Sequence, residues 1–166
     1  MRLLLLTLFL INCSPAFCQY DYNEVKSDKI LIKNLLNKTY SSGSVKELRN
    51  AFGKEKKVIK ERDDALGGYD YTYKYNGLAV CFNNGWQATT ITGPNYTIFF
   101  DKIGYKVGEN ISKFKVQFPL SYAHREHNAT NDNALHIMIA KADAYIFVKY
   151  NDNGYITEIE VANDNS

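Results

Sequence analysis

The chain has 166 residues and a nearly balanced charge, with 20 Lys and Arg residues against 18 Asp and Glu residues and a formal net charge of +2. The charges form no basic stripe or cationic tail, which argues against nucleic acid and anionic membranes as the main partners. The length is typical of one compact domain, or of two small units that share a sheet.

The first 18 residues have the pattern of a signal peptide. Arg2 supplies a positive charge, and the apolar run from Leu3 to Ile11 precedes several small residues. The run is shorter than the ~20 apolar residues that a membrane-spanning helix needs. We therefore expect residues 1–18 to be a signal peptide and the mature protein to be exported to the periplasm or the cell surface.

Three alternatives remain for the processing of this signal. Cleavage after Cys18 fits the small-residue rule best, and cleavage after Ala16 is the second choice. The third is lipidation at Cys13, although Asn12 stands where a lipidation signal has a small residue. A membrane is expected as a partner only if Cys13 is lipidated. Cys81 is retained in all three alternatives, and the chain is not a disulfide-stapled scaffold.

Two helices and a connector are predicted next. Residues 27–37 suit a helix capped by Ser27, and Ser44 with Glu47 forms a capping box that begins a second, short helix. The two helices would form a hairpin. Basic and acidic side chains then interleave over residues 54–64, which favours a solvated connector. The basic members of this run are Lys54, Lys56, Lys57, Lys60 and Arg62.

A row of alternating tyrosines is the clearest strand signal, and an Asn76-Gly77 hairpin turn follows it. Side chains at every second position lie on one face of a strand. A two-residue turn pairs Tyr73 with Val80 and Tyr71 with Phe82, so it places the tyrosines beside aliphatic residues that face the core. The row consists of Tyr69, Tyr71, Tyr73 and Tyr75.

The opposite face of these strands is the candidate binding surface. The alternation places Thr72 and Lys74 there, and the next strand adds Trp86, Ala88 and Thr90. Exposed aromatic and mixed polar side chains suit a protein interface. The alternative interpretation is that Trp86 only covers the end of the hairpin. These five residues are called the predicted face below.

The second half of the chain is predicted to contain one helix and three strands. The helix begins at Asn110 and ends at Pro119, and a polar loop follows over residues 121–133. The expected strands are Leu135–Ala140, Ala144–Tyr150 and Tyr155–Val161, after an earlier one at Tyr96–Phe100. In the last strand, Tyr155, Thr157 and Ile159 are expected on the core side.

The second half repeats the plan of the first. One offset of 66 residues (111 − 45) matches Val45 with Ile111, Leu48 with Phe114 and Phe52 with Phe118. An offset of 68 residues (159 − 91) matches Phe82 with Tyr150 and Ile91 with Ile159. We therefore predict an α+β fold in which two tandem repeats, residues 19–100 and 101–166, form one curved sheet with helices on one face. Both repeats would belong to a single compact domain.

Tandem units of this kind resemble the β-lactamase-inhibitor-protein-like fold. Ile103–Phe114 is similar to the G-x-x-V-G-(D/E)-(S/N)-I-x-(K/E)-(L/V) segment of uncharacterised exported proteins from Bacteroidetes-type bacteria, and Tyr75–Phe82 to their Y-x-G-L-x-V-x-F strand. The resemblance covers about Ser27 to Val161. It implies a non-catalytic protein that binds through the concave face of its sheet and its hairpin loops. No residue matches the enzyme-plugging loop of the true inhibitors, so inhibition is not implied.

The three histidines are the only candidates for metal chemistry. His124, His127 and His136 could supply three nitrogen ligands to a zinc ion that activates water. Their order differs from the helical His-Glu-x-x-His arrangement, and two of them fall in a predicted loop. Cys81 is predicted in mid-strand, away from any helix start that would activate a thiol. No cofactor is expected.

These observations favour an exported, non-catalytic binding module that engages a protein or a cell-envelope component. Two alternatives remain. One is a metal-assisted hydrolase built on His124, His127 and His136. The other is a lipoprotein in envelope assembly, which requires lipidation at Cys13.

Overall fold

A computed structural model describes residues 22–64, 67–83, 86–126, 133–142 and 144–163. The predicted signal peptide, with Cys13, Ala16 and Cys18, lies outside the described residues, and so does His127. Within the described part of the chain, no helix is long and apolar enough to cross a membrane.

The fold is α+β, with many strands and few helices, and its main element is a large mixed sheet. The strands of this sheet lie in the order β1 (Glu24–Lys26), β10 (Asn133–Ala140), β11 (Ala144–Tyr150), β12 (Ile156–Asn163), β7 (Gln87–Ile91), β6 (Leu78–Phe82), β5 (Tyr69–Lys74) and β4 (Lys57–Arg62). Only β1 and β10 pair in parallel, and all the other neighbours are antiparallel.

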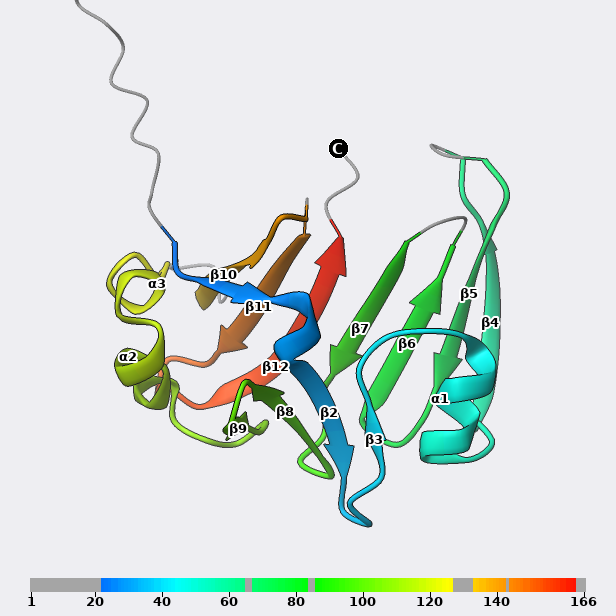
Figure 1. Ribbon diagram of the computed structural model, residues 1–166, viewed down its shortest axis with the longest axis horizontal. Helices are drawn as coiled ribbons and strands as arrows, with labels where there is room; N and C mark the ends of the chain where they lie inside the picture. Colours follow the sequence, from blue (N-terminus) through cyan, green and yellow to red (C-terminus); the bar gives the residue numbers. More distant parts are fainter. Residues whose placement is uncertain (1–21, 65–66, 84–85, 127–132, 143, 164–166) are drawn as a thin grey trace, which may run out of the picture.

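A second sheet of four strands was not expected from the sequence. Its order is β3 (Thr39–Tyr40), β2 (Ile30–Asn34), β8 (Tyr96–Phe100) and β9 (Ile103–Tyr105). Figure 1 shows these strands crossing in front of the larger sheet. The prediction that Tyr96–Phe100 joins one continuous sheet is therefore wrong, because this strand pairs with β2 instead.

The core lies between the two sheets. Buried residues alternate with half-buried ones along β8, β10 and β11, as expected for strands with one covered face. An aromatic cluster closes one end, where the rings of Tyr105 and Phe114 stack with their centroids 3.9 Å apart. Phe100 and Phe118 pack in the same cluster.

The predicted helix after Ser44 is confirmed as α1 (Val45–Phe52). Its capping box forms as expected, because the Glu47 backbone N–H donates to Ser44 Oγ at 3.3 Å and the Ser44 backbone N–H donates to Glu47 Oε2 at 2.7 Å. Leu48 is fully buried, and Phe52 packs edge-on against Tyr75 of the larger sheet's first hairpin.

The predicted helix over residues 27–37 is wrong, and no helical hairpin forms there. A 3-10 turn, η1 (Ser27–Lys29), leads directly into β2. The side chains of Ile30 and Ile32 are buried on one side of β2, with Leu31 half-buried on the other. β-branched residues at alternate positions suit a strand, and pairing with β8 overrides the helical spacing of the apolar residues.

The predicted connector over residues 54–64 is also wrong, because Lys57–Arg62 forms β4 at the edge of the larger sheet. Five of its six side chains are exposed, which explains why its composition resembles that of a solvated loop. A strand at a sheet edge needs only one pairing partner, here β5, and its charged side chains lie in water.

The Asn76-Gly77 turn and its pairing are confirmed. Tyr73 pairs with Val80 and Tyr71 with Phe82, and the Tyr75 backbone N–H donates to the Leu78 carbonyl at 2.7 Å. The prediction for the tyrosine row holds for only half of it. Tyr73 and Tyr75 pack against the core, but Tyr69 and Tyr71 are 49% and 38% exposed because α1 does not reach the far end of β5.

The helical segment after Asn110 is longer and more broken than expected. It consists of η2 (Ile111–Lys113), α2 (Phe114–Gln117) and α3 (Pro119–Ala123). Pro119 begins α3, so the polar loop predicted from residue 121 starts too early and its last residue, Asn133, belongs to β10. Residues 127–132 of that loop lie outside the described residues.

The three last strands are confirmed with one shift in register. A β-bulge at Lys149/Tyr150 pairs Tyr150 with Ile156, so that Ile156 is buried instead of the expected Tyr155 and Thr157. Tyr155 is 50% exposed. Beyond the bulge the expected alternation is regained, and Ile159 is fully buried opposite Val148.

Two pairings join residues that lie at similar separations along the chain. Ile32 of β2 pairs with Ile98 of β8, and these residues are 66 positions apart (98 − 32). Ile91 of β7 pairs with Ile159 of β12, at a separation of 68 positions (159 − 91). All four side chains are almost completely buried.

Candidate functional site

The structure places four residues of the predicted face together. Thr72 pairs with Cys81 and Cys81 with Ala88, so this row crosses β5, β6 and β7. A parallel row is formed by Lys74, Ala79 and Thr90. Because directly paired residues share a face, all these side chains lie on the side of the sheet away from the second sheet. This side is called the open face below.

A shallow hollow of about 380 Å³ lies on the open face beside the Asn76-Gly77 turn. Thr72, Lys74 and Thr90 line it, together with backbone near Gly77. The end of β7 is fastened to this turn, since the backbone N–H groups of Thr92 and Gly93 donate to the Gly77 carbonyl at 3.0 and 3.1 Å. These hydrogen bonds therefore hold one edge of the hollow in place.

Trp86, the fifth residue of the predicted face, immediately precedes β7 and is half-buried. Its indole Nε1 is buried and has no hydrogen-bond partner among the described residues, and the same is true of Oδ1 of Asp70 on β5. Buried polar atoms are nearly always paired in native proteins, so these two atoms are exceptions at this end of the sheet.

The open face extends beyond the predicted residues over the other half of the larger sheet. Thr90 pairs with Glu160 of β12, Glu160 with Phe147 of β11, and Phe147 with His136 of β10. The face on which these side chains lie could be predicted from the sequence, because residues between the buried ones in each strand must face the other way. On the same side, Lys149 and Glu158 form an ion pair at 2.8 Å.

Aromatic rings gather at the far end of the open face. The Tyr22 ring stacks on His136 with centroids 5.7 Å apart, and His136 meets the edge of Phe147 at 4.7 Å. Tyr145 lies beside Phe147, with ring centroids 6.0 Å apart. Burial lowers the pKa of His136, and the Glu126 carboxylate opposes this shift. The His136 ring is therefore favoured in its neutral form, which suits a stacking surface.

The histidine alternative gains no geometric support. His124 is exposed at the end of α3, whereas His136 is half-buried in the aromatic cluster on β10. The described residues, which do not include His127, contain no group of three or more side chains able to hold a metal ion. Burial raises the pKa of the Cys81 thiol, with a smaller opposing effect of its hydrogen bond with Thr72, so the thiol is protonated at neutral pH.

Comparison of the chain with protein-family models, with curated proteins and with solved structures finds no match.

Proposed function

We propose that the protein is an exported, non-catalytic binding module that engages a protein or cell-envelope partner through the open face of the larger sheet. Residues 1–18 would act as its signal peptide. The proposal extends the predicted face of Thr72, Lys74, Trp86, Ala88 and Thr90 to the neighbouring strands β10, β11 and β12.

One row of mixed chemistry carries this proposal. It runs across six adjacent strands in the order Lys74, Ala79, Thr90, Glu160, Phe147 and His136. Lys74 is exposed, and the other five side chains are half-buried. Small side chains in the middle let a partner approach the sheet, while aromatic rings at one end offer the large contact area found at the centres of protein interfaces.

We further propose that the fold consists of two tandem repeats with their helices on one face of the sheet. The pairings of Ile32 with Ile98 and of Ile91 with Ile159 support this, because their separations of 66 and 68 residues equal the two offsets of the predicted repeat. Ile98 would then belong to the second repeat, so the boundary would lie before β8 and not after residue 100. A local two-fold axis would pass through both pairs. Each half also has the same order of elements: a short hairpin of the smaller sheet, a helical segment, then a meander of the larger sheet.

Recovery of partners from an envelope extract tests the proposed binding face. Immobilised wild-type protein is compared with Lys74→Glu, which changes the charge at one end of the row, and with Trp86→Ala, which removes the large ring before β7 at the other end of these strands. The matched control is Val116→Ala, since Val116 is 86% exposed on α2, away from the open face. We expect the control to recover the same proteins as the wild type and both face variants to lose at least one of them.

Circular dichroism of each variant shows whether a loss reflects binding or folding. Lys74→Glu is the more decisive variant because Lys74 is exposed, so its replacement leaves the core intact. Equal recovery of every partner by the wild type, Lys74→Glu and Trp86→Ala would contradict a binding role for this face.

A further inference from the structure

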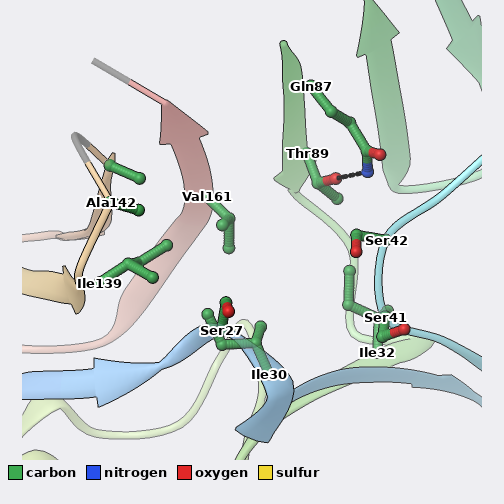
Figure 2. A pocket seen from close by; sticks show the side chains of 11 residues that line it. Ser27, Ile30, Ile32, Ser41, Ser42, Gln87, Thr89, Ile139, Ala142 and Val161 are labelled. Carbon is green, nitrogen blue, oxygen red and sulfur yellow. Dashed lines mark hydrogen bonds between the residues drawn. The ribbon is translucent and has the colours of Figure 1, made fainter. Parts of the chain in front are cut away.

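A cavity of about 200 Å³ lies between the two sheets, on the side opposite the open face. Figure 2 shows side chains from β2, β7, β10 and β12 converging on it. One wall is mainly aliphatic and consists of Ile30, Ile32, Ile139, Ala142, Ala144 and Val161, with the side chain of Ser27 beside Ile30. The other wall is polar and consists of Gln87, Thr89, Ser41 and Ser42. Such a cavity has one apolar side and one hydrogen-bonding side.

The hydrogen bonds of Gln87 show which polar groups remain for a ligand. Its Oε1 accepts from the Tyr40 hydroxyl at 3.1 Å and from the Gly43 backbone N–H at 3.2 Å. Its Nε2 donates one hydrogen to Thr89 Oγ1 at 3.3 Å. The second amide hydrogen of Gln87 and the hydroxyl hydrogen of Thr89 have no acceptor among the described residues. The polar wall therefore offers two hydrogen-bond donors to a ligand.

These donors are held in place by the fold. Thr89 is only 5% exposed, and Gln87 links β7 to the segment before α1 through Tyr40 and Gly43. Burial raises the pKa of the Tyr40 hydroxyl to about 12, so Tyr40 stays a hydrogen donor to Gln87 throughout the physiological range. Because Tyr40 and Gly43 hold the Gln87 oxygen, the amide nitrogen on the other side is turned toward Thr89.

Size and charge limit what the cavity can hold. An apolar cavity of about 150 Å³ in another protein accepts benzene, so a volume of this order suits a molecule with six to eight heavy atoms. None of the described residues that line the cavity is charged, and Asp143, between the lining residues Ala142 and Ala144, lies outside them. Transfer of an ion into such a space would be unfavourable, since no opposite charge among the described lining residues compensates for its lost hydration.

We propose that this cavity binds a short aliphatic chain that ends in one uncharged hydrogen-bond acceptor, such as a hydroxyl or an amide carbonyl. The chain lies against the aliphatic wall, and the acceptor takes the free hydrogens of Thr89 and Gln87. This site is independent of the open face, because Thr89 and Val161 point to the opposite side of the sheet from Thr90 and Glu160.

Titration calorimetry with 1-hexanol tests the proposal, with hexanoate as the charged analogue of the same chain. We expect saturable heat and shifts of the Gln87 and Thr89 amide signals in NMR spectra with hexanol, and neither effect with hexanoate. Saturable binding of hexanoate that equals that of hexanol would overturn the proposed preference for an uncharged end.

Two variants test the contributions of the aliphatic wall and the polar wall to binding separately. Val161→Phe fills the space and should abolish hexanol binding, whereas Val58→Phe, at an exposed valine on β4, should leave it unchanged. Thr89→Val keeps the side-chain shape but removes the hydroxyl, and should weaken binding about three- to tenfold, the worth of one hydrogen bond. If Val161→Phe does not fold, Thr89→Val still tests whether hexanol binds in this cavity.

Three further outcomes would also overturn the proposal. These are no saturable heat in the wild type, unchanged binding by a folded Val161→Phe variant, and equal binding by Thr89→Val. Trp86→Ala should bind hexanol like the wild type, so a failed partner recovery and a failed hexanol titration remain distinguishable.

Discussion

At the scale of single residues, Gly77 shows how a turn and a close backbone contact combine. Its φ of 84° lies in the left-handed region, and a Cβ added there would lie 2.6 Å from Cα of Gly93. Gly53, at the end of α1, has a similar φ of 80° but no atom within 4 Å of such a Cβ. The two glycines thus share the conformational requirement and differ in the space available.

We expect Gly77→Ala to be more destabilising than Gly53→Ala. Gly53, with φ 80° and ψ −162°, lies in a region that is nearly restricted to glycine, so Gly53→Ala is predicted to cost about 1–3 kcal/mol. At Gly77 the added methyl group also forces the turn and β7 apart, so we expect a loss of at least ~3 kcal/mol. Urea unfolding of both variants measures these values. Similar losses would show that the contact between Gly77 and Gly93 relaxes easily.

The Arg49–Glu55 pair links α1 to the segment before β4 and makes stability dependent on pH. Two hydrogen bonds of 2.6 and 2.9 Å join the guanidinium to the carboxylate. They lower the pKa of Glu55 from 4.5 to about 2. In the unfolded chain the Glu55 carboxylate takes up a proton near its ordinary pKa, whereas in the folded chain it takes up the proton only at a lower pH. This contribution to stability is therefore present above pH 4.5 and is lost as the pH falls toward 2.

Glu55→Gln should consequently make the free energy of unfolding less dependent on pH under acidic conditions. We expect the variant to be less stable than the wild type near neutral pH and to lose less stability on acidification through the range between the two pKa values. Urea midpoints measured across that range give both quantities. Glu24→Gln, at an exposed glutamate of β1, is the control and should follow the wild type. Parallel profiles for Glu55→Gln and the wild type would argue against the pair.

At the scale of elements, β4 is an edge strand protected by its own charges. Lys57, Lys60 and Arg62 lie along it, and the Lys60 ammonium stands 3.8 Å from the centroid of the exposed Tyr69 ring. Positive side chains on an edge oppose pairing with the edge of another molecule. Lys60 thus covers an aromatic ring and discourages association at the same time.

Replacing Lys60 with valine should make the protein prone to association. The change removes one edge charge, adds a β-branched side chain and uncovers Tyr69, all of which favour strand addition. We expect faster growth of light scattering at high protein concentration. Lys60→Arg, which keeps the charge over the ring, should remain like the wild type, and so should Lys115→Val on α2. Unchanged scattering by Lys60→Val would show that the edge is protected in another way.

The elements that could be predicted from the sequence are those that local contacts determine. The capping box of Ser44 and the Asn76-Gly77 turn act over a few residues, and both formed as expected, with the hairpin register that follows from the turn. β2 was missed because its pairing with β8 joins distant residues. β4 was missed because its side chains are those of a loop, and the bulge at Lys149/Tyr150 has no distinct sequence signal.

The candidate site was predictable in part for the same reason. The pairing register of the first hairpin is local, so Thr72, Lys74, Ala88 and Thr90 were placed on one face correctly. Their continuation into Glu160, Phe147 and His136 depends on the pairing of β7 with β12, which only the folded chain shows. The cavity depends on the smaller sheet, and no local pattern in the sequence indicates a second sheet.

At the scale of the whole molecule, the buried pairings at the centre of each sheet predict one cooperative unfolding transition. Neither half of the larger sheet can separate without exposing Ile91 and Ile159, and the smaller sheet would likewise expose Ile32 and Ile98. The chain contains a single tryptophan, Trp86, which reports on the first half alone. Its fluorescence and the far-ultraviolet circular dichroism should give coincident urea transitions. Two separated midpoints would show that the halves unfold independently.

The pairing of β1 with β10 has a consequence for the rate at which the protein folds. Glu24 pairs with Met138, which lies 114 positions later in the chain (138 − 24), whereas the hairpins of each meander pair close neighbours. Closing a long loop costs chain entropy before any contact compensates for it. A topology rich in such distant pairings is expected to fold in milliseconds to seconds, with β1 docking late onto an already formed sheet.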